Sequence, residues 1–481
     1  ATAEMLHLLL ILAAASASER PPEVGLTVEP IVAVDTHAEN PTADNAESWT
    51  WIRARARQQT DTSQWFLGID GEHHVRHGVD TEAMWNLYVA ESGWAGKLGA
   101  AHVRAGALVE RWGKLDLTPV IDVLNPRDLR AGPLATIEAL RVPVGMTNVE
   151  FGNRQYRLQA TWIPFPSGDR VTTEGSDWAL IKPGMLNAFV RDASNWPGTS
   201  AIVLADPLRQ LGDTLNDTAP STVRTLTNSL GSIDQPEDDA LHGNYGIRLA
   251  MEQPGLDAAL VVANLRSNIP QTKLSPALKD ILINETLPAI DETNALLEDP
   301  PIQTMWPRSW MMGAELATTA GPFGIRSEAG WWSNKALQQP WFEASLSPAI
   351  AAGLGIDWAH GSQVFVALEA RWHQWIEPTD TLYLTAEQRV EVGGTARFAL
   401  FNDNVELQAA TLVDIHYKEW MARPEVRWRL SDPVSVGVGA IVIDGPEDPP
   451  ATIQETLTWE GGPLGLMTEN DCVFFSMRWI Q

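Results

Sequence analysis

The chain lacks long hydrophobic runs. After the N-terminal stretch, no apolar run reaches the roughly 18 residues that a transmembrane helix needs, and mean hydropathy over the 481 residues is −0.13. These values exclude a helical membrane protein. They do not exclude a transmembrane β-barrel, because the lipid-facing residues of its strands alternate with polar residues that face the lumen.

Cysteine and positive charge are also scarce. Cys472 is the single cysteine, so the chain can form neither an internal disulfide framework nor a thiolate metal cluster. One thiol is compatible with passage through an oxidising periplasm. Lys and Arg number 34 against 61 Asp and Glu, giving a net charge of −27. We therefore expect no nucleic-acid partner, which would need a basic face. Part of the excess lies in the stretches 290–300 and 444–456, which we interpret as solvated loops, with binding of divalent cations as the alternative.

Signals of catalysis are few. Neither H-E-x-x-H nor G-x-S-x-G occurs, and the ten histidines are scattered. His73, His74 and His77 form the only local group and could hold a metal ion, although solvated side chains at a strand end are the favoured interpretation. We expect no cofactor and no enzymatic activity. A barrel enzyme with a Ser/His/Asp or Asp/His site at one rim stays open as an alternative.

Tryptophan, in contrast, is abundant. The chain has 21 Trp but only 5 Tyr and 11 Phe. Such a load suits the aromatic girdles of a membrane barrel, where an amphipathic ring lies at headgroup level. It also suits stacking on sugars. We expect a girdle from the residues at predicted strand ends, namely Trp331, Trp332, Trp341, Trp372 and Trp375.

The N-terminus resembles a signal peptide. Met5 to Ala17 is apolar and ends in Ala15-Ser16-Ala17, which fits the small-residue rule for cleavage. The stretch departs from the usual pattern because Glu4, and no Lys or Arg, precedes it. We expect residues 1–17 to be removed, leaving one domain over 18–481. A retained amphipathic or buried helix is the alternative.

The dominant signal beyond residue 24 is a period of two. In 423–430, charged residues occupy every odd position, while Pro424, Val426, Trp428 and Leu430 lie between them. Successive side chains of a strand point to opposite faces, so each such segment has one apolar and one polar face. The pattern recurs along the whole chain and predicts an all-β protein.

Three features favour a transmembrane barrel over a soluble sandwich. The predicted strands run about 10–13 residues, whereas soluble strands average five or six. Their polar faces carry many Arg and Glu, which suits a watery lumen. Short connections alternate with long ones at 110–139, 166–242, 268–307, 375–387 and 444–469. The sequence therefore predicts an antiparallel up-and-down barrel with long extracellular loops and short periplasmic turns.

The predicted barrel has about eighteen strands, with sixteen as the alternative. The strands are expected near 24–36, 48–59, 64–76, 82–93, 97–109, 140–152, 154–164, 243–253, 256–267, 308–320, 323–335, 340–357, 361–374, 387–400, 403–417, 420–431, 433–443 and 470–480. The last resembles the C-terminal targeting strand of outer-membrane barrels, although it ends in Gln481 and not in an aromatic residue. Segment 276–298 has helical spacing and is expected to form a short helix within a loop.

One motif carries a family resemblance. Trp112-Gly113 followed by Asp116 gives W-G-x-x-D, and Asp122, Asn125, Pro126 and Asp128 belong to D-x-x-N-P-x-D-L. Together they resemble an uncharacterised family of Gram-negative outer-membrane porin-like β-barrels. The resemblance covers the first third of the chain and implies an outer-membrane location and porin-like transport.

The same segment can be interpreted from its residues. Gly113 allows a conformation that ends a strand, and Asn125-Pro126 starts a turn. The 30 residues that follow the strand could fold into the lumen as a constriction loop, with Arg127, Asp128 and Arg130 at the narrowest point. An ordered loop that braces the wall is an equally good interpretation.

Alternation assigns many charged residues to the lumen. The basic ones are Arg53, Arg55, Arg57, Arg157, Arg248, Arg326, Arg371, Arg397, Arg423, Arg427, Arg429 and Arg478, and they are accompanied by Glu252, Glu315, Glu328, Glu369, Glu406 and Glu425. A ladder of Arg would favour anions. Because buried charges are usually paired, bracing of the wall by Arg–Glu pairs is the favoured interpretation.

The expected function is passive or substrate-biased diffusion of small solutes, anionic ones included, through an outer-membrane porin-like channel. The alternative is a structural or interaction barrel with a plugged lumen, whose external loops bind a partner protein or surface polymer. Expected partners are outer-membrane lipid and lipopolysaccharide and small solutes. A second protomer or an accessory outer-membrane protein could also cover an apolar face.

Overall fold

The structure is a computed structural model. It describes residues 23–36, 46–77, 81–135, 140–171, 178–180, 185, 188–189, 192, 242–286, 302–378 and 381–481. The expected signal peptide over 1–17 and the acidic stretch 290–300 lie outside the described residues.

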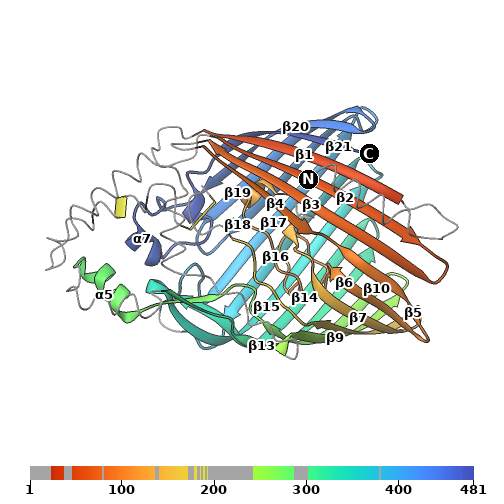
Figure 1. Cartoon of the computed structure of the whole chain (residues 1–481), viewed down its shortest axis with the longest axis horizontal. Helices are drawn as coiled ribbons and strands as arrows, with labels where there is room; N and C mark the ends of the chain where they lie inside the picture. The colour runs from red at the N-terminus through yellow and green to blue at the C-terminus, as the bar shows by residue number, and fades with distance from the viewer. Residues whose placement is uncertain are drawn as a thin grey trace.

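The strands form one closed antiparallel sheet (Figure 1). β1 (Glu23–Asp35) pairs with β2 (Ala46–Gln59) on one edge and with the last strand, β21 (Cys472–Ile480), on the other, which closes the ring. The sheet contains 19 strands. Two of them, β4 (Thr81–Val89) and β5 (Ser92–Leu98), pair with different parts of β3 (Ser63–His77) and share one place in the ring. The barrel therefore has 19 − 1 = 18 strand positions, which confirms the predicted count.

The other strands follow in chain order around the ring. They are β6 (Ala101–Leu108), β7 (Val144–Gly152), β8 (Tyr156–Ile163), β9 (Asn244–Gln253), β10 (Leu256–Arg266), β13 (Arg308–Ala320), β14 (Phe323–Gln339), β15 (Glu343–His360), β16 (Val364–Trp375), β17 (Gln388–Leu400), β18 (Val405–Asp414), β19 (Glu419–Ser431) and β20 (Val434–Asp444). A hairpin of β11 (Gln271–Leu274) and β12 (Ile302–Met305) forms a separate two-stranded sheet.

Tight turns occupy one end of the barrel and long connections the other (Figure 1). Pro254-Gly255, Gly321-Pro322 and Asp432-Pro433 each join two strands directly. Gly255 and Gly321 adopt positive φ angles of 80° and 62°, which a glycine accepts without strain. At the opposite end lie the described parts of the connections 109–143, 164–243, 267–307, 376–387 and 445–471, with helices α5 (Pro276–Asn284) and α7 (Ile453–Leu457). In bacterial outer-membrane barrels the short turns lie in the periplasm and the long loops outside the cell, and we name the two ends accordingly.

The outer face of the barrel is apolar. Side chains such as Leu158, Leu249, Leu260 and Leu368 lie exposed on neighbouring or opposite strands. Such an apolar face can contact lipid hydrocarbon. Closure of the sheet pairs the backbone N–H and C=O groups of its strands, which lipid could not hydrogen-bond. A closed antiparallel sheet with an apolar outer face has the architecture of a transmembrane β-barrel. Among the described residues, no helix combines the length and apolar character needed to cross a membrane.

Strand boundaries near residue 95 differ from the prediction. The sequence pattern suggested strands at 82–93 and 97–109, but the chain continues through β5 to Leu98 and turns at Gly99, whose φ is 62°. The reason is a β-bulge. Ile69 pairs with Val89 and Phe66 with Gly93, so three residues, 90–92, lie opposite two. The extra residue shifts the alternation by one, which a period of two cannot reveal.

Two other predictions need correction. Trp332 and Trp375 do not belong to a girdle, because both are buried in an internal apolar cluster, while Trp331 is exposed on the outer face. The segment predicted as a strand over 340–357 begins as a 3-10 turn, η4 (Pro340–Phe342), and its strand extends to His360. The positive φ of Trp341, 57°, ends β14 there.

Candidate functional site

The connection 109–143, which we call the inner loop, leaves the wall after β6 and folds into the lumen. Three wall glutamates hold its backbone: Glu315 on β13, Glu328 on β14 and Glu369 on β16, each no more than 4% exposed. Backbone N–H groups donate to these carboxylates from Gly113 to Glu315, from Lys114, Leu115, Val120 and Ile121 to Glu328, and from Asp116, Leu117 and Thr118 to Glu369. Charge-assisted bonds of this kind are the stronger class. They anchor the inner loop along its length.

Glycines in the wall let the inner loop approach closely. A Cβ at Gly353 would lie 2.4 Å from Leu115 Cδ1, and one at Gly393 would lie 2.8 Å from Leu117 Cβ. Gly246 and Gly313 make the same room for Trp112 and Ile121. Glycine within a strand often marks such an approach of another segment. These inward glycines are a sequence signal for loop docking that strand alternation alone does not reveal.

An apolar core fills this side of the lumen. Trp112 and Ile121 are fully buried and pack with Met311, Trp332 and Trp375 from the wall. The indole N–H of Trp112 donates to Gln159 Oε1 at 3.2 Å. The inner loop is therefore packed against the wall from β7 to β16.

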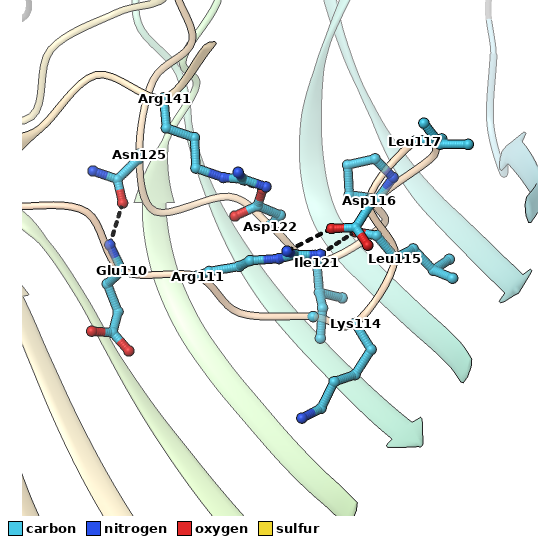
Figure 2. Close-up of polar contacts among 12 residues, drawn as sticks. Glu110, Arg111, Lys114, Leu115, Asp116, Leu117, Ile121, Asp122, Asn125 and Arg141 are labelled. Atoms are coloured by element: carbon cyan, nitrogen blue, oxygen red, sulfur yellow. Dashed lines mark hydrogen bonds and ion pairs between the residues drawn. The ribbon is translucent and has the colours of Figure 1, made fainter. Parts of the chain in front are cut away.

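The second half of the motif closes the base of the inner loop (Figure 2). Asn125 Nδ2 donates to the carbonyls of Leu108 and Val142, both at 2.9 Å, and Asn125 Oδ1 accepts from the backbone N–H of Glu110 at 2.8 Å. One side chain thus ties the end of β6 to the segment that enters β7. Asp122 adds an ion pair with Arg141 at 2.6 Å.

Asp116 forms ion pairs where the inner loop meets β14. Its carboxylate binds Arg111 at 2.6 Å, as Figure 2 shows, and Arg326 of β14 at 2.8 Å. Burial would raise the pKa of Asp116, but the hydrogen bond from Arg326 and the charge of Arg111 outweigh it and hold the pKa below the ordinary value. The Asp116 carboxylate is therefore ionised at neutral pH.

Arg127, Asp128 and Arg130, predicted at a constriction, have different environments. Asp128 binds Arg130 at 2.6 Å and Arg170 at 3.4 Å, and Arg130 reaches Glu72 of β3 at 2.9 Å. Burial opposes the charge on Arg130, but the hydrogen bond and charge of Asp128 raise its pKa. Arg127 is largely enclosed, and burial lowers the pKa of its guanidinium. The contacts of Asp128 and Arg130 connect the inner loop to the wall opposite β14.

Two cavities border strands β2 to β6, and the upper one lies between these strands and the inner loop. The upper cavity, about 340 Å³, is lined by Trp49, Trp51, Arg53, Arg55, Asp70, Gly71, Glu72, Tyr88, Val89, Ala90, Glu91, Val109, Asp128, Ala131, Ala135, Arg141, Val142, Pro143 and Arg170. The lower cavity, about 740 Å³, lies toward the periplasmic turn and is lined by residues 55–57, 59–64, 66–67, 91, 95–97, 102 and 104. Arg55 and Glu91 line both cavities, so the two meet at these side chains.

The three predicted arginines of β2 follow one another down these cavities. Arg53 pairs with Glu29 at 3.0 Å and Arg55 with Asp70 at 2.5 Å. In the described part of the chain, Arg57 and Lys97, which both line the lower cavity, have no ion-pair partner. Lys97 was not among the residues singled out from the sequence.

Most of the other predicted arginines pair with acidic residues of the wall or inner loop. Arg157 pairs with Glu150 and Glu252, Arg248 with Glu315, Arg326 with Asp116, Asp357 and Glu369, Arg371 with Glu391, and both Arg423 and Arg427 with Glu425. Arg429 shares the inner face of β19, and no described acidic side chain pairs with it.

The histidines considered for a metal site do not converge. His73 stacks on Trp85 of the outer face at 4.2 Å, whereas His74 is buried inside against Glu47. Adjacent residues of a strand point to opposite faces, so these two rings cannot share an ion. The side chain of His77 lies outside what the structure describes, and the described residues contain no group of three or more His, Cys, Asp or Glu placed to hold a metal.

No protein-family model matches the chain, and no curated protein matches it either. Solved structures that resemble it are Gram-negative outer-membrane porins. OccK3 (OpdO) of Pseudomonas aeruginosa is 9% identical, with 98% of this chain and 99% of that chain covered and a TM-score of 0.47. OpdK of the same organism, solved with vanillate, is 8% identical, with 96% and 98% covered and a TM-score of 0.45. OccAB3 of Acinetobacter baumannii is 6% identical, with 96% and 99% covered and a TM-score of 0.44.

Proposed function

We propose that the protein is a porin-like channel whose solutes pass along the β2 to β6 side of the lumen, beside the inner loop. The observation that carries this proposal is the pair of cavities that meet at Arg55 and Glu91. The opposite side is filled by the apolar core around Trp112. A channel with one packed side keeps its solutes in contact with a defined set of side chains, which suits substrate-biased diffusion.

The charges along this route favour small anions. Four cations, Arg55, Arg57, Lys97 and Arg104, line the lower cavity against two acids, Asp61 and Glu91. Arg57 and Lys97 lack an ion-pair partner among the described residues and can therefore attract a passing anion. Most other arginines of the lumen are held in ion pairs that brace the barrel, and we assign selectivity to Arg57 and Lys97 because they line the lower cavity.

Single-channel recording in planar bilayers under a KCl gradient tests the proposal. The purified protein is expected to give stable current steps with a reversal potential on the anion side. In the double variant Arg57→Gln/Lys97→Gln the reversal potential should move toward the cation side, with conductance kept within about twofold because no structural ion pair is lost. The matched control is Arg429→Gln, an inward arginine on β19, which should leave the reversal potential unchanged.

Two outcomes would contradict the proposal. An equal shift in the Arg429→Gln variant would show that the lower cavity does not filter ions. No current from protein that still migrates as a heat-modifiable barrel would favour a plugged barrel, whose external loops bind a partner protein or surface polymer. That alternative is favoured by one observation, the dense packing of the inner loop.

A further inference from the structure

Two arginines lie on the outer face of the barrel at the extracellular end of β10 and β13. Arg266, the last residue of β10, lies directly opposite Arg308, the first residue of β13. Leu265 of β10 and Met311 of β13 are buried in the internal apolar core. Because successive side chains of a strand point to opposite faces, Arg266 and Arg308 point outward.

An aromatic row on the outer face sets the depth of this pair. Trp162 of β8 lies opposite Tyr245 of β9. Asn264 of β10 separates Tyr245 from Trp310 of β13, and these two rings meet edge to face at 6.0 Å. Outward aromatic rows mark the boundary between hydrocarbon and headgroups. The two arginines stand two residues beyond the row, about 7 Å along their strands, which places them at headgroup level.

No acidic side chain compensates the two charges. Within the described residues, neither Arg266 nor Arg308 forms an ion pair. By alternation, no other Lys or Arg of the described ring strands faces outward. Side chains directly opposite on antiparallel strands have Cβ atoms about 4.5–5.5 Å apart, and like charges in such a pair are destabilising. An anion from outside the chain would relieve this repulsion.

Neutral acceptors hold one guanidinium group in place without neutralising it. Arg308 Nη1 donates to Asn264 Oδ1 at 2.5 Å, and Arg308 Nη2 donates to the carbonyl of Gly243 at 2.8 Å. A guanidinium has five N–H groups, so three of those on Arg308 are left for a ligand. No described hydrogen bond uses the guanidinium of Arg266, which is half-buried. The planar fork of arginine matches the oxygens of a phosphate group.

We propose that Arg266 and Arg308 bind the phosphate groups of lipopolysaccharide, the phosphorylated glycolipid of the outer leaflet. Its acyl chains lie below the aromatic row, along outward side chains such as Ile247, Leu260 and Met312, which are 55%, 62% and 52% exposed. A lipid fits the site better than a free anion, because the guanidinium groups stand directly above this apolar surface. The site lies on the outside of the barrel, so lipid binding there is independent of the proposed channel.

Addition of lipopolysaccharide to refolded protein tests the site. Protein refolded from inclusion bodies into detergent carries no lipopolysaccharide, and a ligand that binds only the folded barrel raises the temperature of its heat-modifiable transition. Lipopolysaccharide should raise this temperature in the unmodified protein. Lipopolysaccharide stripped of its phosphates should not, and neither should inorganic phosphate at the same phosphate concentration. In Arg266→Gln/Arg308→Gln the apparent Kd for lipopolysaccharide should increase by at least about tenfold, because two charge-assisted contacts are lost.

The matched control is Arg57→Gln/Lys97→Gln, which removes two positive charges from the lumen and none from the outer face. This variant should bind lipopolysaccharide like the unmodified protein. Conversely, Arg266→Gln/Arg308→Gln should keep the reversal potential of the unmodified protein in a KCl gradient. The lipid site and the channel are therefore tested by different variants and different measurements, and either proposal can fail while the other stands.

Arg266→Glu keeps the proposal testable if the double variant fails to fold. A carboxylate opposite Arg308 would form a cross-strand ion pair and take the place of the phosphate group. The transition temperature of the lipid-free protein should rise, and lipopolysaccharide should no longer raise it further. An equal response of Arg266→Glu and unmodified protein to lipopolysaccharide would overturn the site, as would an equal response of the unmodified protein to intact and dephosphorylated lipopolysaccharide. A response to inorganic phosphate as large as that to lipopolysaccharide would overturn the lipid as the ligand.

Discussion

At the scale of single residues, the unusual feature of the lumen is that wall carboxylates accept hydrogen bonds from the backbone of the inner loop. Strand alternation predicts that Glu315, Glu328 and Glu369 face the lumen as counterions for arginine. Glu328 instead accepts four backbone N–H groups from the inner loop, two on each oxygen. A segment that leaves the sheet loses its strand partners, and buried N–H groups need acceptors. Carboxylates on the wall supply them.

Glu328→Gln tests this role. The variant keeps the shape of the side chain but replaces two acceptor positions with an NH₂ group, which cannot accept. We expect the docked inner loop to lose on the order of 3 kcal/mol. Single-channel currents should become larger and noisier, and the temperature of the heat-modifiable transition should fall. The control, Glu252→Gln, removes a carboxylate that is 39% exposed and pairs with Arg157. Quiet, unchanged currents in Glu328→Gln would mean that the other two glutamates are sufficient.

At the scale of elements, the inner loop and the wall fit together through missing side chains. Five inward glycines, on β9, β13, β15 and β17, would place a Cβ within 3 Å of inner-loop atoms: Gly246, Gly313, Gly353, Gly355 and Gly393. Interiors are close-packed, so added atoms must displace something. A rigid side chain such as the indole of Trp112 moves least to make room. A substitution at the glycine that faces Trp112 is therefore the clearest test of packing.

Gly246→Val is therefore expected to displace Trp112. Its Cβ would lie 2.5 Å from the indole ring, and overpacking of this kind costs about 1–3 kcal/mol. The heat-modifiable transition should move to a lower temperature, and a second substitution, Trp112→Leu, should restore part of the loss by making room. Gly145→Val serves as the control, because a Cβ there meets nothing within 4 Å. Equal destabilisation at Gly145 would show that lost backbone freedom, and not packing against the inner loop, explains the effect.

The elements also show which features of the fold can be predicted from strand alternation. Alternation placed β18 and β19 within a few residues, because both strands separate lipid from lumen along their full length. It failed between Val89 and Ala101, where a bulge changes the parity and the chain turns at Gly99. It also missed the inner-loop anchor, because acceptance of backbone N–H by Glu328 depends on where the chain folds back. The alternation of side chains along a strand does not indicate where a loop folds back onto the wall.

At the scale of the whole molecule, the barrel is asymmetric. Strands β7 to β16 support the packed core around Trp112, whereas β2 to β6 border the two cavities. A second apolar cluster packs Leu134 of the inner loop against β1, β2, β20 and β21. The predicted arginines divide accordingly. Arg248, Arg326 and Arg371 brace the packed side through ion pairs, and Arg53, Arg55 and Arg57 line the open side. The sequence assigned all six to the lumen but could not separate them, because the division depends on which wall the inner loop covers.

Closure of the ring is the remaining requirement at this scale. β21 pairs with β20 on one edge and with β1 on the other, and the backbone of Gln481 exchanges two hydrogen bonds with that of Leu26. Removing residues 472–481 would leave two full strand edges in lipid, where nothing replaces their hydrogen bonds. We expect the truncated chain to lose heat-modifiable migration and to become trypsin-sensitive throughout. Replacing α5 with a Gly-Ser segment of equal length should leave both properties intact, because α5 lies outside the sheet. A truncated chain that kept a heat-modifiable, protease-resistant barrel would show that β1 and β20 can pair directly, and that seventeen strand positions suffice to close this sheet.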